Sequence, residues 1–301
     1  MVAVVGPTAA GKSAVALELA ALVGGEIVSA DSMQVYRGMD IGTAKPSAGD
    51  RRRVPHHLID LVDPEDDLSV AAFQAEGREV MTRLAAADTA AVIVGGSGLH
   101  LRALVDPLEF PPTDADLRRR VERLEPAAAV ASLLAADPAA AEHVDLANHR
   151  RVVRALEVWQ LTGQTPSARA CSDAARQVRG FRARVPFVGV AFDPGDVLPG
   201  RVAARCDRML EEGLIDEVIR LRPRLGSTAR QAVGYKEVLA HLERGSSVET
   251  IRRAIIDATT SLARRQRTFF RKDPRLRWLP WLADPRRRLD AVCAVVEEAA
   301  S

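Results

Sequence analysis

The stretch Gly6-Pro7-Thr8-Ala9-Ala10-Gly11-Lys12-Ser13 decides the fold of this chain. It fits the pattern G-x-x-x-x-G-K-[ST], and it stands between four apolar residues, Val2–Val5, and a segment with apolar residues at helical spacing. This order is typical of phosphate-binding sites, because the N–H groups of the loop and the positive end of the helix cradle a di- or triphosphate. We therefore expect Gly6 through Ser13 to bind phosphate, with Lys12 on the terminal phosphates and the Ser13 hydroxyl on Mg²⁺.

Further strand candidates follow along the chain, with helix-like segments between them. They are Glu26–Ala30, Ala91–Val94, Val185–Ala191 and Leu276–Leu279. Strands that alternate with helices predict a parallel sheet covered by helices. From Pro111 to Gln177 the pattern is instead helix after helix, rich in alanine and arginine, with Pro138 and Pro166 as breaks. We predict an α/β fold: a P-loop NTPase-like core of residues 1–112 and 179–301, and a helical insertion domain of residues 113–178.

The composition is that of a globular protein. The chain has 301 residues, of which 47% are hydrophobic and 27% charged, and this excludes disorder, collagen and small disulfide scaffolds. No apolar run approaches the ~18 residues that a membrane helix needs, and no basic leader precedes the first strand, so we expect a cytoplasmic protein that binds no membrane. The three cysteines form no C-x-x-C pair, so a structural zinc site is not expected.

Three aspartates could act beside the phosphate loop: Asp31, Asp60 and Asp63. None is followed by a glutamate that could serve as a hydrolytic base, which favours group transfer over nucleotide hydrolysis. Asp31 follows the second predicted strand, from where it could accept a proton from a nucleophile or bind a water on Mg²⁺. An aspartate in an Asx-turn is an equal alternative on the residues alone.

At this point the chain resembles a known family, the bacterial tRNA dimethylallyltransferases. The resemblance is carried by motifs in the same order along nearly the whole chain, and the stretch from Asp31 to Pro46 is the most specific of them. The other motifs are the phosphate loop, Pro55–Asp60, Val94–Leu99, Arg154–Val158, Gln231–Glu237 and Ala263–Gln266.

The resemblance implies transfer of a dimethylallyl group from dimethylallyl diphosphate to N6 of the adenosine at tRNA position 37, next to the anticodon, with release of diphosphate. The phosphate loop would then hold the prenyl diphosphate together with Mg²⁺. By the same analogy Asp31 orients and deprotonates the N6 amine, Thr8 bonds the bridging region of the diphosphate, and Arg205 helps to hold that group. A solvated charge on an amphipathic helix is the alternative for Arg205.

A tRNA substrate implies a surface that grips the anticodon stem-loop and splays out one base. The family analogy and the clusters of basic residues give these candidates for tRNA contact: Asp31, Ser32, Met33, Gln34, Ser97, Arg118, Arg150, Arg154, Gln231 and Arg264. On the late helix, predicted from Ile251 to Lys272, we expect Ile255, Leu262 and Phe269 to form the apolar stripe and Arg264 to lie on the opposite side. Ser97 stands where the family often has threonine, and His100 where tyrosine is common.

Three other functions fit parts of the pattern. A small-molecule kinase would share the phosphate loop, an adenylate prenyltransferase would use free nucleotide, and a non-catalytic RNA-binding protein would retain the loop without turnover. The intact Thr8, Lys12, Ser13 and Asp31 argue against the last. Because one set of active-site residues is complete in one chain, we expect a monomer.

Overall fold

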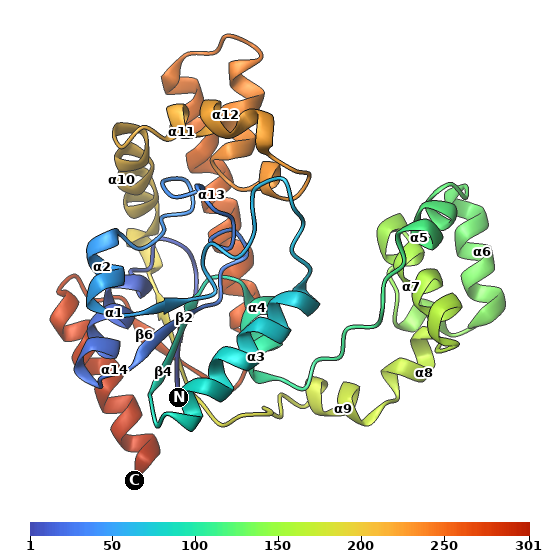
Figure 1. Ribbon diagram of the computed structural model, residues 1–301, viewed down its shortest axis with the longest axis horizontal. Coiled ribbons are helices and arrows are strands. Elements are labelled where there is room, and N and C mark those ends of the chain that lie inside the picture. Colours follow the sequence, from blue (N-terminus) through green and yellow to red (C-terminus); the bar gives the residue numbers. More distant parts are fainter. The chain divides into compact units, whose positions relative to one another are not determined.

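A parallel six-stranded sheet organises the computed structural model, which describes residues 1–301 (Figure 1). The strand order is β3-β2-β4-β1-β5-β6, and every neighbouring pair is parallel. The strands are β1 Val2–Val5, β2 Glu26–Ser29, β3 His56–His57, β4 Ala91–Gly95, β5 Val188–Asp193 and β6 Leu276–Pro280. Since all six run the same way, their carboxyl ends meet at one edge, where α/β sheets bind ligands.

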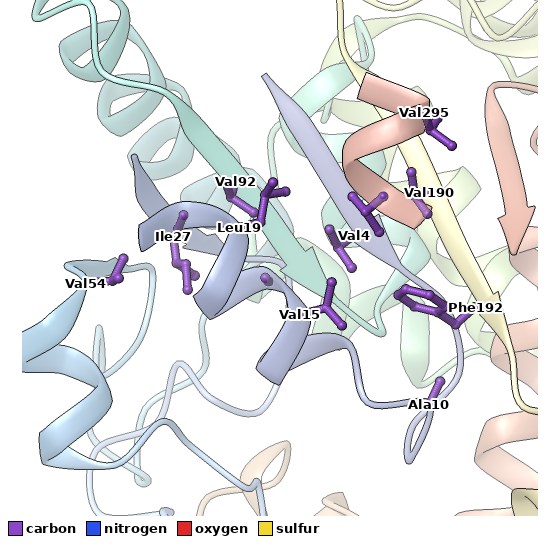
Figure 2. Packing of buried hydrophobic residues seen from close by; sticks show 13 residues of the cluster. Val4, Ala10, Val15, Leu19, Ile27, Val54, Val92, Val190, Phe192 and Val295 are labelled. Atoms are coloured by element: carbon purple, nitrogen blue, oxygen red, sulfur yellow. The ribbon is translucent and has the colours of Figure 1, made fainter. Parts of the chain in front are cut away.

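The phosphate loop joins this sheet to its first helix, α1 (Lys12–Leu22), which packs with the C-terminal helix α14 (Pro285–Ala300) on one face. The register places Val4 beside Val94 of β4 and Val190 of β5, so alternate valines of the central strands share that face. Figure 2 shows Val15 of α1 and Val295 of α14 among the side chains that cover them. Burying each such side chain contributes about 1.5–3 kcal/mol, which fixes the strand that leads into the loop.

Helix α2 lies on the α1 side, where Arg53 pairs with Glu18 at 2.6 Å, and the remaining helices of the core cover the other face or extend beyond the carboxyl edge. Helices α3 and α4 pack on each other and on β4, and the long helix α13 packs on α10, α12 and α4. Their bounds are α2 Ala48–Arg53, α3 Val70–Ala86, α4 Gly98–Val105, α10 Leu198–Glu211, α11 Leu214–Leu221, α12 Tyr235–Leu242 and α13 Val248–Phe270. Short 3₁₀ turns lie at Gly195–Val197, Arg222–Arg224 and Ala229–Gln231.

The chain divides into two compact units, one of residues 1–105 and 185–301 and the other of residues 106–184. The second unit holds helices only, around its own core, in which Leu133 of α6 and Leu156 of α7 are fully buried. The stretch 113–178 that the sequence assigns to an insertion lies inside this unit. Its helices are α5 Ala115–Glu122, α6 Pro126–Ala136, α7 His149–Thr162, α8 Pro166–Ala170 and α9 Asp173–Arg179, with a 3₁₀ turn at Ala140–Glu142.

Sequence reasoning found five of the six strands, and its expectation of a parallel α/β core is confirmed. It missed β3, whose two histidines carry no apolar pattern. Pro166 lies at a break between helices as expected: α7 ends at Thr162 and Pro166 begins α8, where the first helical position needs no N–H donor. None of the helices combines the length and the apolar composition that crossing a bilayer requires.

The apolar stripe of α13 was predicted wrongly at Phe269. Ile255 is buried as expected, but Phe269 is 41% exposed. The buried side runs through Ile251, Ile255, Thr259 and Ala263 instead. A repeat of four residues, rather than seven, keeps these side chains on one side over the first four turns of the helix.

Candidate active site

A cavity of about 140 Å³ is lined by residues that follow the carboxyl ends of β1, β2 and β4. Helices α10 and α13 and the segment before α12 complete its wall. Because three adjacent strands deliver their loops to this point, the cavity lies where the topology predicts a ligand site. Its polar wall includes Thr8, Lys12, Ser13, Asp31, Arg205 and Gln266, and its apolar wall includes Met33, Val94, Met209, Val233, Ile255 and Leu262.

The phosphate loop turns sharply between β1 and α1. Ala9 and Gly11 both have positive φ, +60° and +82°, and Gly11 forms the N-cap of α1. The Lys12 ammonium folds back and donates to the Pro7 carbonyl at 2.7 Å. Of the loop residues, Thr8, Lys12 and Ser13 line the cavity, while Gly6, Pro7 and Ala10 are buried beneath it.

Helix α13 reaches the phosphate loop through Gln266. The Gln266 side-chain oxygen accepts a hydrogen bond from the Thr8 backbone N–H at 2.7 Å. Gly96, after β4, makes room for this amide, since a Cβ there would lie 2.5 Å from Gln266 Nε2. The Gly-Gly pair at the end of β4 and the glutamine of α13 therefore belong to one arrangement, although they are 170 residues apart along the chain.

The cavity combines the buried Lys12 and the half-buried Arg205 with one carboxylate. Burial, reinforced by the nearby Arg205 guanidinium and partly offset by Asp31, lowers the pKa of Lys12 to about 7. Burial also lowers the pKa of Arg205, and Asp31 counteracts this effect. A site in which cations repel each other and lack enough acidic partners favours an anionic ligand, because the ligand supplies the missing charge.

The Asx-turn interpretation of Asp31 is confirmed, and its action on a ligand stays a prediction. Its Oδ1 accepts hydrogen bonds from the backbone N–H groups of Met33 at 2.8 Å and Gln34 at 3.3 Å, which is an Asx-turn. The same residue lines the cavity. Because the turn fixes the carboxylate through Oδ1, Oδ2 is the oxygen left to act on a ligand.

The two other candidate aspartates lie elsewhere. Asp60 pairs with Lys45 at 2.5 Å and with Arg51 at 2.7 Å, and these interactions lower its pKa against the opposing effect of burial. Asp63 lies 3.5 Å from Arg37. Neither lines the cavity, so Asp31 is the only one of the three there.

The residues next to Asp31 differ in their availability. Met33 lines the cavity, and so does Gln34, but the Gln34 amide is engaged by the Ser29 hydroxyl at 3.0 Å and by the Thr43 carbonyl at 3.2 Å. Ser32 is half-buried and lies outside the cavity lining. Gln34 therefore holds two loops together in the free chain.

Three more of the candidate tRNA contacts lie outside the cavity. Gln231 and Arg264 are exposed. The Ser97 hydroxyl lies 2.7 Å from Nδ1 of His100, whose ring packs edge-on against Phe73. Burial lowers the pKa of His100, so this ring is neutral at pH 7 and holds the Ser97 hydroxyl in place.

In the helical unit, Arg118 and Arg154 converge on a buried carboxylate. Glu157 Oε2 lies 2.8 Å from Arg118 Nη2 and 2.7 Å from Arg154 Nη1, and the Glu157 side chain is fully buried. Both arginine side chains are partly exposed, at 41% and 33%, and their guanidinium groups compensate the buried charge of Glu157. Arg150 instead lines a separate cavity of about 700 Å³, whose other basic residues are His143, Arg151, Arg154, Arg169 and Arg179.

Comparison with known proteins identifies the family. A family model described as IPP transferase matches residues 34–273. The chain belongs to this family. A tRNA dimethylallyltransferase from Streptomyces coelicolor is 45% identical over 294 residues, which cover 93% of this chain and 89% of the relative. One from Bifidobacterium longum is 42% identical over 290 residues, or 93% and 86% of the two chains. The crystal structure of the tRNA isopentenylpyrophosphate transferase from Bacillus halodurans is 34% identical, with a TM-score of 0.70 over 99% of this chain and 97% of that one.

Membership of the IPP transferase family confirms the resemblance and the P-loop NTPase-like fold. Several cavity residues of this family member were nevertheless missed as site residues. Ile255, Thr259, Leu262 and Gln266 lie on one side of α13, spaced by four, three and four residues. That spacing is visible in the sequence, and the polar Thr259 and Gln266 within an otherwise apolar row are the signal that could have found them.

The cavity could hold a divalent cation only with help from its ligand. Ser13 and Asp31 supply a hydroxyl and a carboxylate, and no group of three histidine, cysteine or acidic side chains is placed to hold a metal. Mg²⁺ usually keeps several waters and binds through one or two protein groups together with substrate phosphates. The donor set therefore fits Mg²⁺ carried by a diphosphate.

Proposed function

We propose that this chain transfers a dimethylallyl group from dimethylallyl diphosphate to N6 of the adenosine at tRNA position 37, next to the anticodon, releasing diphosphate. Relatives that are 42–45% identical over most of the chain carry the name tRNA dimethylallyltransferase. The observation that carries the proposal is one cavity that joins the phosphate loop, the Asp31 carboxylate and an apolar wall. These are the parts that an anionic leaving group, a nucleophile and a prenyl chain need.

The diphosphate would bind the loop from Gly6 to Ser13, with Lys12, Arg205 and the Thr8 hydroxyl on its oxygens. Departure of an allylic diphosphate leaves an electron pair on the bridging oxygen, so cations held in a low-dielectric cavity stabilise the transition state. Lys12 would exchange its bond to the Pro7 carbonyl for a phosphate oxygen. The bound diphosphate then compensates the positive charges of Arg205 and Lys12, which acidic side chains do not fully balance in the free chain.

The prenyl group would lie against the apolar wall on α10 and α13. Met209 and Ile255 are 8% and 2% exposed, and Val233 and Leu262 adjoin them in the cavity. Such a surface excludes water from the allylic carbon, which is needed because an allylic cation reacts with water as readily as with an amine.

The acceptor adenine would enter from the side of Met33 and Asp31. Its N6 attacks C1 of the dimethylallyl group, the C1–O bond breaks, and the bonding electrons leave with the diphosphate. Asp31 Oδ2 accepts the N6 proton, so that a neutral secondary amine results. Reaching N6 in this way requires the base to be flipped out of the anticodon loop.

We also propose Mg²⁺ as the cofactor, held by Ser13 and by the diphosphate oxygens. When bound, the ion supplies further neutralisation of the leaving group.

The helical unit would bind the anticodon stem. Its cavity is basic, and half-burial together with the nearby Arg154 lowers the pKa of Arg169 against the opposing effect of Glu109, so a further anion is favoured there. Phosphates of an RNA backbone would supply such anions, with Arg150, Arg151 and Arg179 as the exposed contacts. Residues 113–178 would thus act as the tRNA-binding insertion. The protein would be a monomer, since one chain supplies the complete wall of the active-site cavity.

Parallel reactions separate this function from the alternatives. The chain is incubated with Mg²⁺ and one of three substrate pairs: dimethylallyl diphosphate with unmodified tRNA, dimethylallyl diphosphate with AMP, or ATP with small-molecule acceptors. We expect prenylated product only in the first. Product in the second would indicate an adenylate prenyltransferase, ATP-dependent phosphorylation would indicate a kinase, and tRNA binding without product would indicate a non-catalytic protein.

A further inference from the structure

Behind the phosphate loop lies a buried cation, two of whose nitrogen atoms have no hydrogen-bond partner. Arg288, in the first turn of α14, is 5% exposed, and both its Nε and its Nη1 are buried and unbonded. It meets the loop at Gly11, where a Cβ would lie 2.1 Å from Arg288 Nη1. A buried polar atom without a partner costs free energy, so such an atom calls for an explanation.

A second guanidinium reaches the same place from α10. Arg201 Nε donates to the Ala9 carbonyl at 2.6 Å, and Arg201 Nη2 lies 3.5 Å from the Cβ position of Gly11. The guanidinium carbons of Arg201 and Arg288 lie 4.5 and 5.3 Å from the ring centroid of Trp281. Trp281 thus holds both cations against the loop by cation–π contacts, which are stronger in desolvated places.

These cations are short of anionic partners. Burial lowers the pKa of Arg201, with Arg288 and Arg208 as further causes. Burial lowers the pKa of Arg288 as well, and Asp284 is the acid that opposes it. They also lie beside Gly11, the N-cap of α1, where the helix dipole adds positive potential. The free chain therefore concentrates unbalanced positive charge behind the loop.

We propose that Arg201 and Arg288 are positioning residues for the diphosphate, which act through the phosphate loop and whose unbalanced charge the bound diphosphate neutralises from the other side. Neither residue lines the cavity, so they act through the shape of the loop and through the electric field rather than by contact. The inference rests on the proposed function, because it takes the loop to bind a prenyl diphosphate.

Two opposite effects on the free and the bound protein follow. In the free chain the unpaired guanidinium destabilises the fold, whereas in the complex its attraction to the diphosphate stabilises the fold. Removing the charge should therefore leave the melting temperature of the free protein unchanged or raise it, and should weaken diphosphate binding about tenfold. A residue that only clamps the loop would instead lower the melting temperature of both forms by the same amount.

The test compares R288M with the control R287M. Arg287 is exposed, and its substitution removes the same charge from the same helix turn. Melting temperature and calorimetric affinity are measured with inorganic diphosphate and Mg²⁺. We expect R288M to bind about tenfold more weakly than R287M, with a smaller rise in melting temperature on binding, and R288K to recover part of the loss. R201M should weaken binding in the same direction, which keeps the proposal testable if R288M does not fold.

Equal affinities for R288M and R287M, or a lower melting temperature of R288M with an unchanged rise on binding, would overturn the inference and leave the proposed function standing. Failure of the unaltered chain to bind diphosphate at all would overturn the proposed function as well.

Discussion

The unusual state of Lys12 makes binding of dimethylallyl diphosphate depend on pH. In the free chain its pKa is about 7, mainly because of burial, against an ordinary value of 10.5. An anion beside the ammonium favours the protonated form and returns the pKa toward its ordinary value. Binding at pH 8 should therefore take up about 0.9 proton from solution.

The size of the effect follows from linkage between protonation and binding. If the pKa rises from about 7 to its ordinary value in the complex, the affinity falls about fivefold from pH 7 to pH 8 and about fiftyfold from pH 7 to pH 9. The stability of the free protein depends on pH in the opposite direction to the affinity. Because the folded pKa is lower than the unfolded one, the unfolded chain binds more protons between pH 7 and 10.5, so this group makes the free protein more stable as the pH rises through that window.

Titration calorimetry with dimethylallyl diphosphate and Mg²⁺, in buffers of different ionisation enthalpy, measures both the affinity and the proton uptake. Lys12→Met serves as the control, because it removes the titrating group and leaves the ionisation of the ligand. If no proton is taken up on binding at pH 8, or if Lys12→Met takes up as many protons as the unaltered chain, the assignment of the proton to Lys12 is refuted.

Four further changes test separate parts of the site. Asp31→Asn should lower kcat about 10²- to 10⁴-fold in single-turnover assays while the Kd for tRNA in filter binding stays unchanged, because proton transfer belongs to the reaction step; a lost affinity for tRNA would instead make Asp31 a docking residue. Arg205→Met should raise the KM for dimethylallyl diphosphate about tenfold in steady-state kinetics, and an unchanged KM would place this side chain off the diphosphate. Met209→Ala should improve the use of geranyl diphosphate relative to dimethylallyl diphosphate about tenfold in competition assays, whereas an unaltered preference would remove Met209 from the prenyl wall. Arg150→Ala should reduce the salt dependence of tRNA binding by about one phosphate contact, and a slope equal to that of the unaltered chain would return Arg150 to plain solvation.

Local patterns predicted much of this fold because the sheet is buried on both faces. Continuous apolar runs such as Val2–Val5 and Ala91–Val94 predict strands that are covered by helices on both faces. The glycines at their ends mark the carboxyl edge of the sheet. By contrast β3 rests on two backbone bridges to β2 and contains only His56 and His57. Its pairing is decided by the neighbouring strand, which no local pattern reveals.

The candidate site shows the same division. Lys12 and Asp31 follow strands directly, so their meeting at one edge could be predicted from the strand order. Gln266 and Arg288 reach the phosphate loop from segments more than 250 residues further along the chain, and only tertiary packing brings them there. Likewise, no local pattern reveals that Arg118 and Arg154 share the buried Glu157, and their contact with tRNA stays a prediction.

Nucleoside analysis of the tRNA product tests the central claim most directly. The chain is incubated with Mg²⁺, labelled dimethylallyl diphosphate and two transcripts that differ only in having adenosine or guanosine at position 37. We expect one dimethylallyl group on N6 of that adenosine, an equal amount of released diphosphate, and no label on the guanosine transcript. Label on both transcripts, or diphosphate release without label on RNA, would contradict the claim that this chain prenylates the adenosine next to the anticodon.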